Sequence, residues 1–271
     1  MASGKQSRQK RRAAVPPPVR SKNLRRRRQA SPRVLFVAGA IVVAIVISAV
    51  VGFGSTGGKS SSADKLPTNG SLVNALPGAG NVNALLKGIP QQGLTLGSRT
   101  APVTLVEYID LQCPYCREFE TTVMPQVVKD YVRTGRVKVV ARVLDFIGPD
   151  SGRGRAAMIA AGKQGKGFNL AQLLYDNQGT ENTGWLNDDM VAAASRSVPG
   201  LNPRELFATR TSAAVTQKAD TIDRQANADG VVGTPTLFVG KTGGPSTQVR
   251  LTSPTDAATL VRALNAARAS S

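Results

Sequence analysis

The chain has 271 residues, which is enough for one or two domains with a substantial hydrophobic core. It carries 35 Lys and Arg against 17 Asp and Glu, together with two cysteines and no histidine. Without histidine, Cys–His hydrolase chemistry is excluded, and the chain alone cannot supply the four ligands that a structural zinc site requires.

The positive charge is concentrated at the N-terminus. Residues 1–33 hold twelve Lys and Arg, including four consecutive arginines at 25–28, and no acidic residue. Such a tail is a candidate for nucleic-acid binding, but it has no aromatic side chain for base stacking and it directly precedes an apolar stretch. We interpret residues 1–33 as a basic cytoplasmic tail with a role in membrane topology, and we expect no nucleic-acid partner.

Residues 34–53 form a stretch of twenty residues without a charge. A helix of this length spans about 30 Å, the thickness of the hydrocarbon layer. A cleaved signal peptide has a shorter apolar region and a small-residue cleavage site, and buried core helices are rarely apolar over such a length. We therefore predict a single transmembrane helix acting as a signal anchor in the cell membrane. The positive-inside rule places the N-terminus in the cytoplasm and the C-terminal part outside it.

Residues 54–92 are rich in Gly, Ser, Asn and Pro, which is typical of a flexible tether. Residues 72–86 are compatible with a short helix, whereas Pro77, Gly78 and Gly80 argue against a long one. We expect the folded domain to occupy residues 93–271.

The folded domain alternates strand and helix patterns. Residues 103–109 and 137–143 are β-branched apolar runs, and between them residues 116–131 have helical spacing with a kink or break expected at Pro125. Residues 151–228 are mostly helical in character, and two strands at 235–239 and 248–251 and a helix at 255–268 follow. The pattern predicts an α/β fold in which a helical insertion, about 151–228, interrupts one small sheet.

The two cysteines, Cys113 and Cys116, lie between a predicted strand and a predicted helix, separated by Pro114 and Tyr115. A helix N-terminus stabilises a thiolate, and proline suits the first helical turn. We expect Cys113 to be exposed, with a lowered pKa, and to attack, and Cys116 to be buried and to resolve. A structural disulfide across so short a loop would stabilise little, and a zinc site would need a second chain, so redox chemistry is favoured.

Glu107 stands six residues before Cys113 within an otherwise apolar strand. One interpretation is that Glu107 faces solvent from an edge strand. The other is that it is buried, and because burying a carboxylate costs free energy, a buried Glu107 would call for a functional reason. We favour the second interpretation.

The sequence VTLVEYIDLQCPYC at residues 103–116 resembles the active-site region of DsbA-like proteins in the thioredoxin superfamily, most closely the membrane-anchored or lipid-anchored bacterial branch. The sequence GVVGTPT at residues 230–236 resembles the cis-proline loop of that family, and the similarity extends from about residue 93 to 268. The resemblance implies a thioredoxin-like fold with a helical insertion and a protein thiol–disulfide oxidoreductase.

The resemblance also implies roles for individual residues. It places Thr234 and a cis Pro235 beside Cys113, with the Thr234 peptide binding an extended substrate segment. It places Glu107 beneath the active site, where it handles the proton of the buried cysteine. It implies no cofactor other than the redox-active disulfide of Cys113 and Cys116, and no metal.

The family resemblance further suggests an exported oxidase that introduces disulfides into reduced secreted proteins. Because the chain has no second cysteine pair, an integral-membrane partner of the DsbB or vitamin-K-epoxide-reductase type is expected to reoxidise it. Tyr115 stands where strong oxidants of the family commonly carry histidine, and CPYC is typical of glutaredoxins. A membrane-tethered reductase or isomerase, and a non-catalytic thioredoxin-fold binding module, therefore remain alternatives.

Overall fold

The computed structural model describes residues 65–269. The predicted cytoplasmic tail, the predicted transmembrane anchor at 34–53 and the tether residues 54–64 lie outside this part of the chain. Between residues 65 and 269, no helix is both long enough and apolar enough to cross a membrane.

A six-stranded sheet forms the centre of the domain, in the order β1-β2-β4-β3-β5-β6. The strands are β1 (Gln91–Gln92), β2 (Thr95–Leu96), β3 (Val103–Ile109), β4 (Val137–Val143), β5 (Thr236–Lys241) and β6 (Ser246–Val249). β3 pairs in parallel with β4 and antiparallel with β5, so it occupies the interior of the sheet. Its β-branched and apolar side chains suit this position, because a central strand is covered on both faces.

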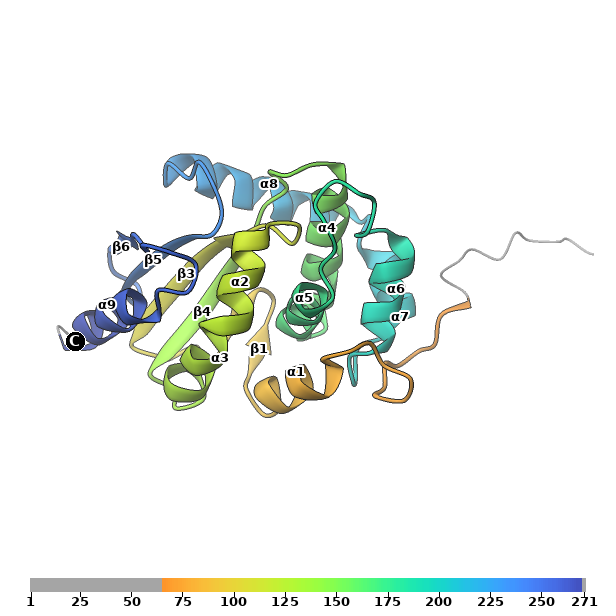
Figure 1. Cartoon of the computed structure of the whole chain (residues 1–271), viewed down its shortest axis with the longest axis horizontal. Helices are drawn as coiled ribbons and strands as arrows, with labels where there is room; N and C mark the ends of the chain where they lie inside the picture. The colour runs from red at the N-terminus through yellow and green to blue at the C-terminus, as the bar shows by residue number, and fades with distance from the viewer. Residues whose placement is uncertain (1–64, 270–271) are drawn as a thin grey trace, which may run out of the picture. The chain divides into compact units, whose positions relative to one another are not determined.

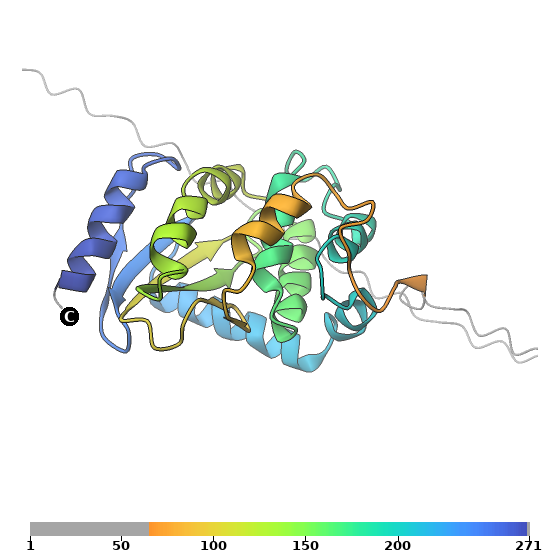
Figure 2. The ribbon, with the colours of Figure 1, turned by 90° about the horizontal axis from the view of Figure 1, so that it is seen from below.

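Helices cover both faces of this sheet. Figure 2 shows α9, α2 and α1 above the strands and α8 beneath them. The helices are α1 (Ala79–Leu86), α2 (Pro114–Thr122), α3 (Met124–Val127), the π-helical turn η2 (Val128–Val132), α4 (Pro149–Lys163), α5 (Gly167–Asp176), α6 (Asp188–Arg196), α7 (Pro203–Thr209), α8 (Ala213–Ala228) and α9 (Ala257–Ala269).

The predicted helical insertion is confirmed. Helices α4 to α8 lie between β4 and β5 in the chain, and in Figure 1 α4 to α7 are gathered beside the sheet while α8 runs behind α4 along the top of the view. β5 then returns next to β3, so the insertion separates two strands that are neighbours in space. The insertion therefore brings the loop before β5 to the same end of the sheet as the loop after β3.

The expected break at Pro125 is also confirmed. The helical run after the cysteines divides into α2, α3 and η2, and Pro125 lies at the first turn of α3. Because proline has no backbone N–H to donate to the preceding turn, it can begin a helical segment but does not continue one.

The boundary predicted between tether and domain is wrong. Residues 65–92 are part of the folded structure rather than a flexible tether. The backbone amide of Gly70 donates to the Leu201 carbonyl at 2.6 Å, and α1 then buries Ala79, Val82 and Leu86. A Cβ at Gly70 would lie 2.1 Å from the Val198 carbonyl oxygen, so this close contact with the insertion needs glycine. The free energy gained by burying these apolar side chains outweighs the tendency of this Gly- and Pro-rich sequence to stay in turns, which suggested a tether.

Candidate functional site

The two cysteines lie where β3 leads into α2. Cys113 is the N-cap of α2, and the backbone amide of Cys116 donates a hydrogen bond to the Cys113 Sγ at 3.3 Å. Pro114 occupies the first helical position, where its missing N–H leaves no partner unsatisfied. Both thiols are free. Contrary to the expectation that Cys113 is exposed, its accessibility is only 3 %, and that of Cys116 is 0 %.

The two thiols differ in acidity. Hydrogen bonding, first from the Cys116 thiol and then from Thr234 and backbone amides, lowers the pKa of Cys113 to about 6 against the opposing effect of burial. Burial, reinforced by the neighbouring Cys113, raises the pKa of Cys116 well above its ordinary value. At neutral pH the pair therefore consists of a Cys113 thiolate and a Cys116 thiol.

The loop before β5 covers Cys113, which explains its low accessibility. The Cys113 Sγ lies 3.3 Å from the Thr234 carbonyl oxygen, to which it donates when it is protonated, and the Thr234–Pro235 peptide bond is cis. The antiparallel pairing of β3 and β5, with Tyr108 opposite Thr236, brings this loop to the end of β3. The predicted cis bond and the predicted proximity of Thr234 to Cys113 are both confirmed.

Glu107 is buried, with an accessibility of 1 %, on a strand that is paired on both sides. The edge-strand interpretation is therefore wrong. Burial raises the pKa of the Glu107 carboxyl to about 7, and a hydrogen bond with Glu120 partly offsets this increase. The same burial, together with the charge of Glu107, raises the pKa of Glu120 well above its ordinary value.

Glu120 is a site residue that sequence reasoning missed. It is 6 % accessible, on α2 one turn after Cys116. A signal was present in the sequence, because residues four apart share a helix face, and Glu120 therefore lies on the same side of α2 as the buried cysteine. Tyr175 of α5 joins the cluster: burial, followed by the charges of Cys116, Glu120 and Glu107, raises its pKa well above the ordinary value.

Polar side chains fix the loop between β3 and α2. The Asp110 carboxylate accepts hydrogen bonds from the Ser151 hydroxyl at 2.7 Å and from the Gln112 backbone amide at 2.8 Å. From the end of α5, the Gln178 side-chain amide donates to the carbonyl oxygens of Leu111 and Cys113 at 2.9 and 3.2 Å. The helical insertion therefore holds the backbone of the cysteine loop in place, and no sequence motif indicated these contacts.

Comparison with known proteins identifies the family. Residues 90–254, more than half of the chain, match the family described as thioredoxin. The chain belongs to the thioredoxin family. A probable disulfide bond formation protein D of Bacillus cereus is 29 % identical over 148 residues, which is 54 % of this chain and 68 % of that protein.

Solved structures of thioredoxin-like proteins have the same fold. Oxidised BdbD of Bacillus subtilis is 19 % identical, with a TM-score of 0.57 over 67 % of this chain and 98 % of the other. A thioredoxin-like oxidoreductase of Silicibacter pomeroyi is 26 % identical, with a TM-score of 0.53 over 70 % of this chain and 98 % of the other. Together with the cysteine pair, these similarities make this thioredoxin-family chain a DsbA-like thiol–disulfide oxidoreductase.

Two further observations on this DsbA-like enzyme concern the exposure of Tyr115 and possible metal ligands. Tyr115 points into solvent, with 61 % of its surface accessible, in the first turn of α2. In the part of the chain that the structure describes, no group of three or more His, Cys, Asp and Glu side chains is arranged to hold a metal ion.

Proposed function

We propose that this protein is an exported oxidase that introduces disulfides into secreted proteins through the Cys113–Cys116 disulfide. In this proposal, residues 1–33 lie in the cytoplasm, residues 34–53 anchor the chain in the cell membrane, and the domain described above lies outside it. The charge asymmetry and the uncharged stretch of the sequence support this topology.

The observation that carries the oxidising direction is the environment of the Cys113 sulfur. Hydrogen bonds lower its pKa to about 6, so the reduced enzyme holds a stabilised thiolate at neutral pH. A disulfide becomes more oxidising when its reduced form is stabilised. The site geometry therefore favours donation of the disulfide to substrates over reduction of substrate disulfides.

The proposed reaction has two exchange steps. A substrate thiolate attacks the Cys113 Sγ, the bond to Cys116 breaks, and the electron pair leaves on the Cys116 sulfur, which takes up a proton. A second substrate thiolate then attacks the substrate sulfur of this mixed disulfide. The products are a substrate disulfide and the reduced enzyme, with a Cys113 thiolate and a Cys116 thiol.

Neighbouring residues have proposed roles in these steps. Thr234 aligns the substrate backbone beside Cys113, Pro114 and Tyr115 shape the turn between the cysteines, and Glu107 supplies the proton that Cys116 takes up. An integral-membrane partner of the DsbB or vitamin-K-epoxide-reductase type accepts the two electrons of the reduced pair and restores the disulfide.

Exposed apolar side chains around the cysteines support unfolded polypeptides as substrates. Tyr115, Phe146 and Val232, the apolar rim, are 61 %, 50 % and 97 % accessible. Tyr115 lies between the cysteines, and Val232 is two residues before Thr234. Phe146 precedes Ile147, whose backbone amide donates a hydrogen bond to the Asp110 carboxylate at 3.0 Å. Exposed apolar side chains gathered at a reactive site favour binding to the apolar segments that a secreted protein exposes before it folds.

The redox state of the pair in intact cells tests the proposed direction. Cells that express the full chain are quenched with acid, and free thiols are labelled with a maleimide that shifts the band on a gel. The oxidase predicts a mostly unlabelled pair. A mostly labelled pair would support the reductase or isomerase, and a pair that stays inert toward a small dithiol in the purified protein would support the non-catalytic binding module.

A further inference from the structure

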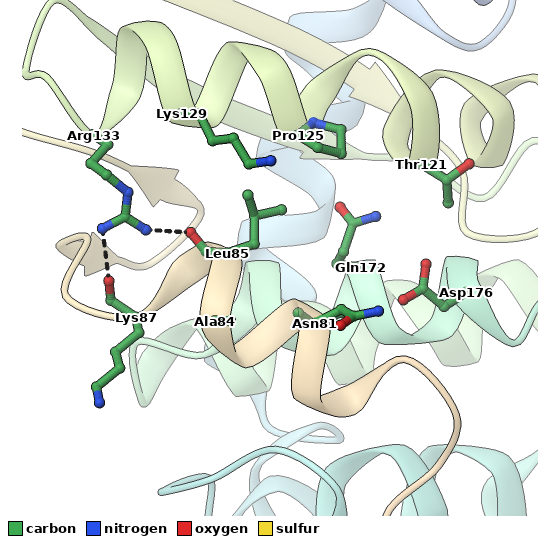
Figure 3. Close-up of a pocket in the computed structure, with 11 residues that line it drawn as sticks. Asn81, Ala84, Leu85, Lys87, Thr121, Pro125, Lys129, Arg133, Gln172 and Asp176 are labelled. Carbon is green, nitrogen blue, oxygen red and sulfur yellow. Dashed lines mark hydrogen bonds between the residues drawn. The ribbon is translucent and has the colours of Figure 1, made fainter.

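A groove of about 700 Å³ lies on the outside of the domain, between α1 on one side and the run of α2, α3 and η2 on the other. Gln172 and Asp176 of α5 lie between these two walls, as Figure 3 shows. Ligand sites in proteins typically have volumes of roughly 300–1,000 Å³. The groove is therefore large enough to hold a short segment of another polypeptide.

The α1 wall of the groove is held at both ends. At the C-terminal end of α1, the Arg133 guanidinium donates to the carbonyl oxygens of Leu85 and Lys87 at 2.6 and 3.1 Å. At the N-terminal end, Gly78 packs so closely against Asp176 that a Cβ there would lie 2.4 Å from the Asp176 Oδ2. Because its wall is fixed in this way, the groove is preformed, which reduces the entropy lost when a ligand binds.

One face of the helical run links the groove to the cysteine pair. Residues four apart share a helix face, so every fourth residue after Cys113 belongs to one row along the run. The row consists of Cys113, Arg117, Thr121, Pro125, Lys129 and Arg133. Its last four members line the groove. The row therefore leads from the attacking cysteine into the groove.

The two ends of the groove differ in charge. At the end nearer the cysteines, burial raises the pKa of Asp176, and the charge of Arg117 acts against this rise. At the other end lie Lys87, Lys129 and Arg133, none of which forms an ion pair with any residue from 65 to 269. Figure 3 shows Lys129 extending from the helical run and Asp176 at the opposite end of the groove. The end far from the cysteines therefore presents positive charge without a compensating carboxylate.

We propose that the groove binds an extended, acidic segment of the substrate polypeptide whose cysteine is joined to Cys113. An acidic side chain of this segment pairs with Lys129, and Lys87 and Arg133 add positive potential at the same end. The apolar groups of Leu85 and Pro125 contact the segment along the groove. The inference rests on the proposed function, because it takes polypeptides as substrates, but it is independent of the oxidising direction.

The geometry of the helical run sets the position of the acidic residue in the substrate. Lys129 stands sixteen residues after Cys113, which at a rise of about 1.5 Å per residue is roughly 24 Å along the run. An extended chain advances about 3.3 Å per residue. The substrate residue that meets Lys129 is therefore about seven positions from the substrate cysteine.

The test measures mixed-disulfide formation at Cys113 in the full-length Cys116→Ser protein, which cannot resolve the adduct. Peptides with one cysteine and a Glu, Gln or Lys about seven positions before or after it displace glutathione from Cys113. The peptide thiolate attacks the Cys113 Sγ, and glutathione leaves as a thiolate. The exchange equilibrium constant of each peptide is measured by mass spectrometry.

The exchange constants should depend on the charge of the peptide. We expect the constant of the Glu peptide to be roughly threefold larger than that of the Gln peptide, which is the size of effect that an exposed ion pair gives. The constant of the Lys peptide should be smaller than both. The differences should disappear at about 1 M salt, where exposed charges are screened.

Substitutions of Lys129 distinguish binding in the groove from other effects of peptide charge. Lys129→Gln should make the Glu and Gln peptides equal, and Lys129→Glu should reverse the preference in favour of the Lys peptide. Lys129 is exposed, so neither substitution disturbs the core. The matched control is Lys218→Gln on α8, which Figure 2 shows on the other side of the sheet, and it should leave the preference unchanged.

Two results would overturn the proposal. One is equal exchange constants for the Glu, Gln and Lys peptides when Lys129 is present, and the other is a preference for Glu that persists in Lys129→Glu. A peptide with Glu only two positions from its cysteine is too short to reach Lys129 and should not respond to either substitution. The exchange equilibrium does not depend on the redox state of the pair in cells, so the groove and the oxidase direction can fail independently.

Discussion

The backbone amide of Cys116 donates to the Cys113 sulfur at 3.3 Å, so the helix that begins at Cys113 stabilises the thiolate of its own N-cap. The largest contribution to the lowered pKa of Cys113 is the hydrogen bond from the Cys116 thiol. The acidity of the first cysteine therefore depends on the second in two ways, through its backbone and through its side chain.

Removal of the Cys116 thiol should separate these two contributions. In the reduced wild type, thiolate absorbance should titrate with a pKa of about 6. In Cys116→Ala, the backbone amide still points at Cys113 but the thiol donor is gone, so we expect the pKa of Cys113 to rise toward its ordinary value. An unchanged pKa in Cys116→Ala would mean that the helix terminus alone sets the acidity.

Single cysteine variants should differ in the complexes they trap. In Cys116→Ser, Cys113 can still form mixed disulfides with secreted proteins, and no second thiol is present to resolve them. Such complexes should therefore accumulate on non-reducing gels and disappear with dithiothreitol. Cys113→Ser should trap almost nothing, because the remaining thiol is buried and has a raised pKa. Equal trapping by both variants would contradict the assignment of Cys113 as the attacking residue.

The buried carboxyl pair should make the oxidised protein less stable as pH rises. The Glu107 pKa is raised from 4.5 to about 7, so its contribution is fully favourable below pH 4.5 and is lost as the pH rises to 7. A shift of this size corresponds to a loss of roughly 3 kcal/mol across that window. Glu107→Gln should reduce this loss, as measured by denaturant unfolding of the oxidised protein at pH 5 and pH 8. Part of the loss should remain, because burial also raises the pKa of Glu120.

The oxidised state is chosen for this measurement because the disulfide removes the titration of Cys113. Glu118→Gln, an exposed substitution two residues before Glu120 on α2, is the matched control and should keep the wild-type pH dependence. If Glu107→Gln lost as much stability between the two pH values as the wild type, the carboxyl pair would not be the origin of the effect.

The proposed topology predicts a specific pattern of proteolysis. Protease added to intact cells without a wall should remove the part of the chain after residue 53 and spare the basic tail. A tag at each end, detected by immunoblot, distinguishes the two fragments. Protection of the C-terminal tag until the membrane is lysed would reverse the predicted orientation.

Local patterns in the sequence were sufficient for the core of the site. The cysteine spacing between a strand and a helix predicted the N-cap position of Cys113, and the resemblance in the loop before β5 predicted the contact of Thr234 with its sulfur. These features depend on short segments whose conformation is set by neighbouring residues or by a specific motif.

Contacts made across the fold were not predictable from the sequence. The spacing of Glu120 from Cys116 indicates only which face of α2 it occupies, and the packing of α2 in the fold brings it to Glu107. The Gln178 side chain, which belongs to the insertion, donates to the Cys113 carbonyl oxygen. The hydrophobic periodicity of the sequence predicts the helices of the insertion but not where they pack. The early start of the domain was missed because α1 is held by burial against α5 of the insertion, and this burial outweighs its weak local helix signal.

The reduction potential of the purified protein, measured by equilibration with glutathione buffers, tests the oxidase proposal most directly. Stabilisation of the Cys113 thiolate should place the potential above that of thioredoxin, about −270 mV, while the neutral Tyr115 should keep it below that of DsbA, about −120 mV. A potential at or below that of thioredoxin would contradict the oxidase and favour the reductase.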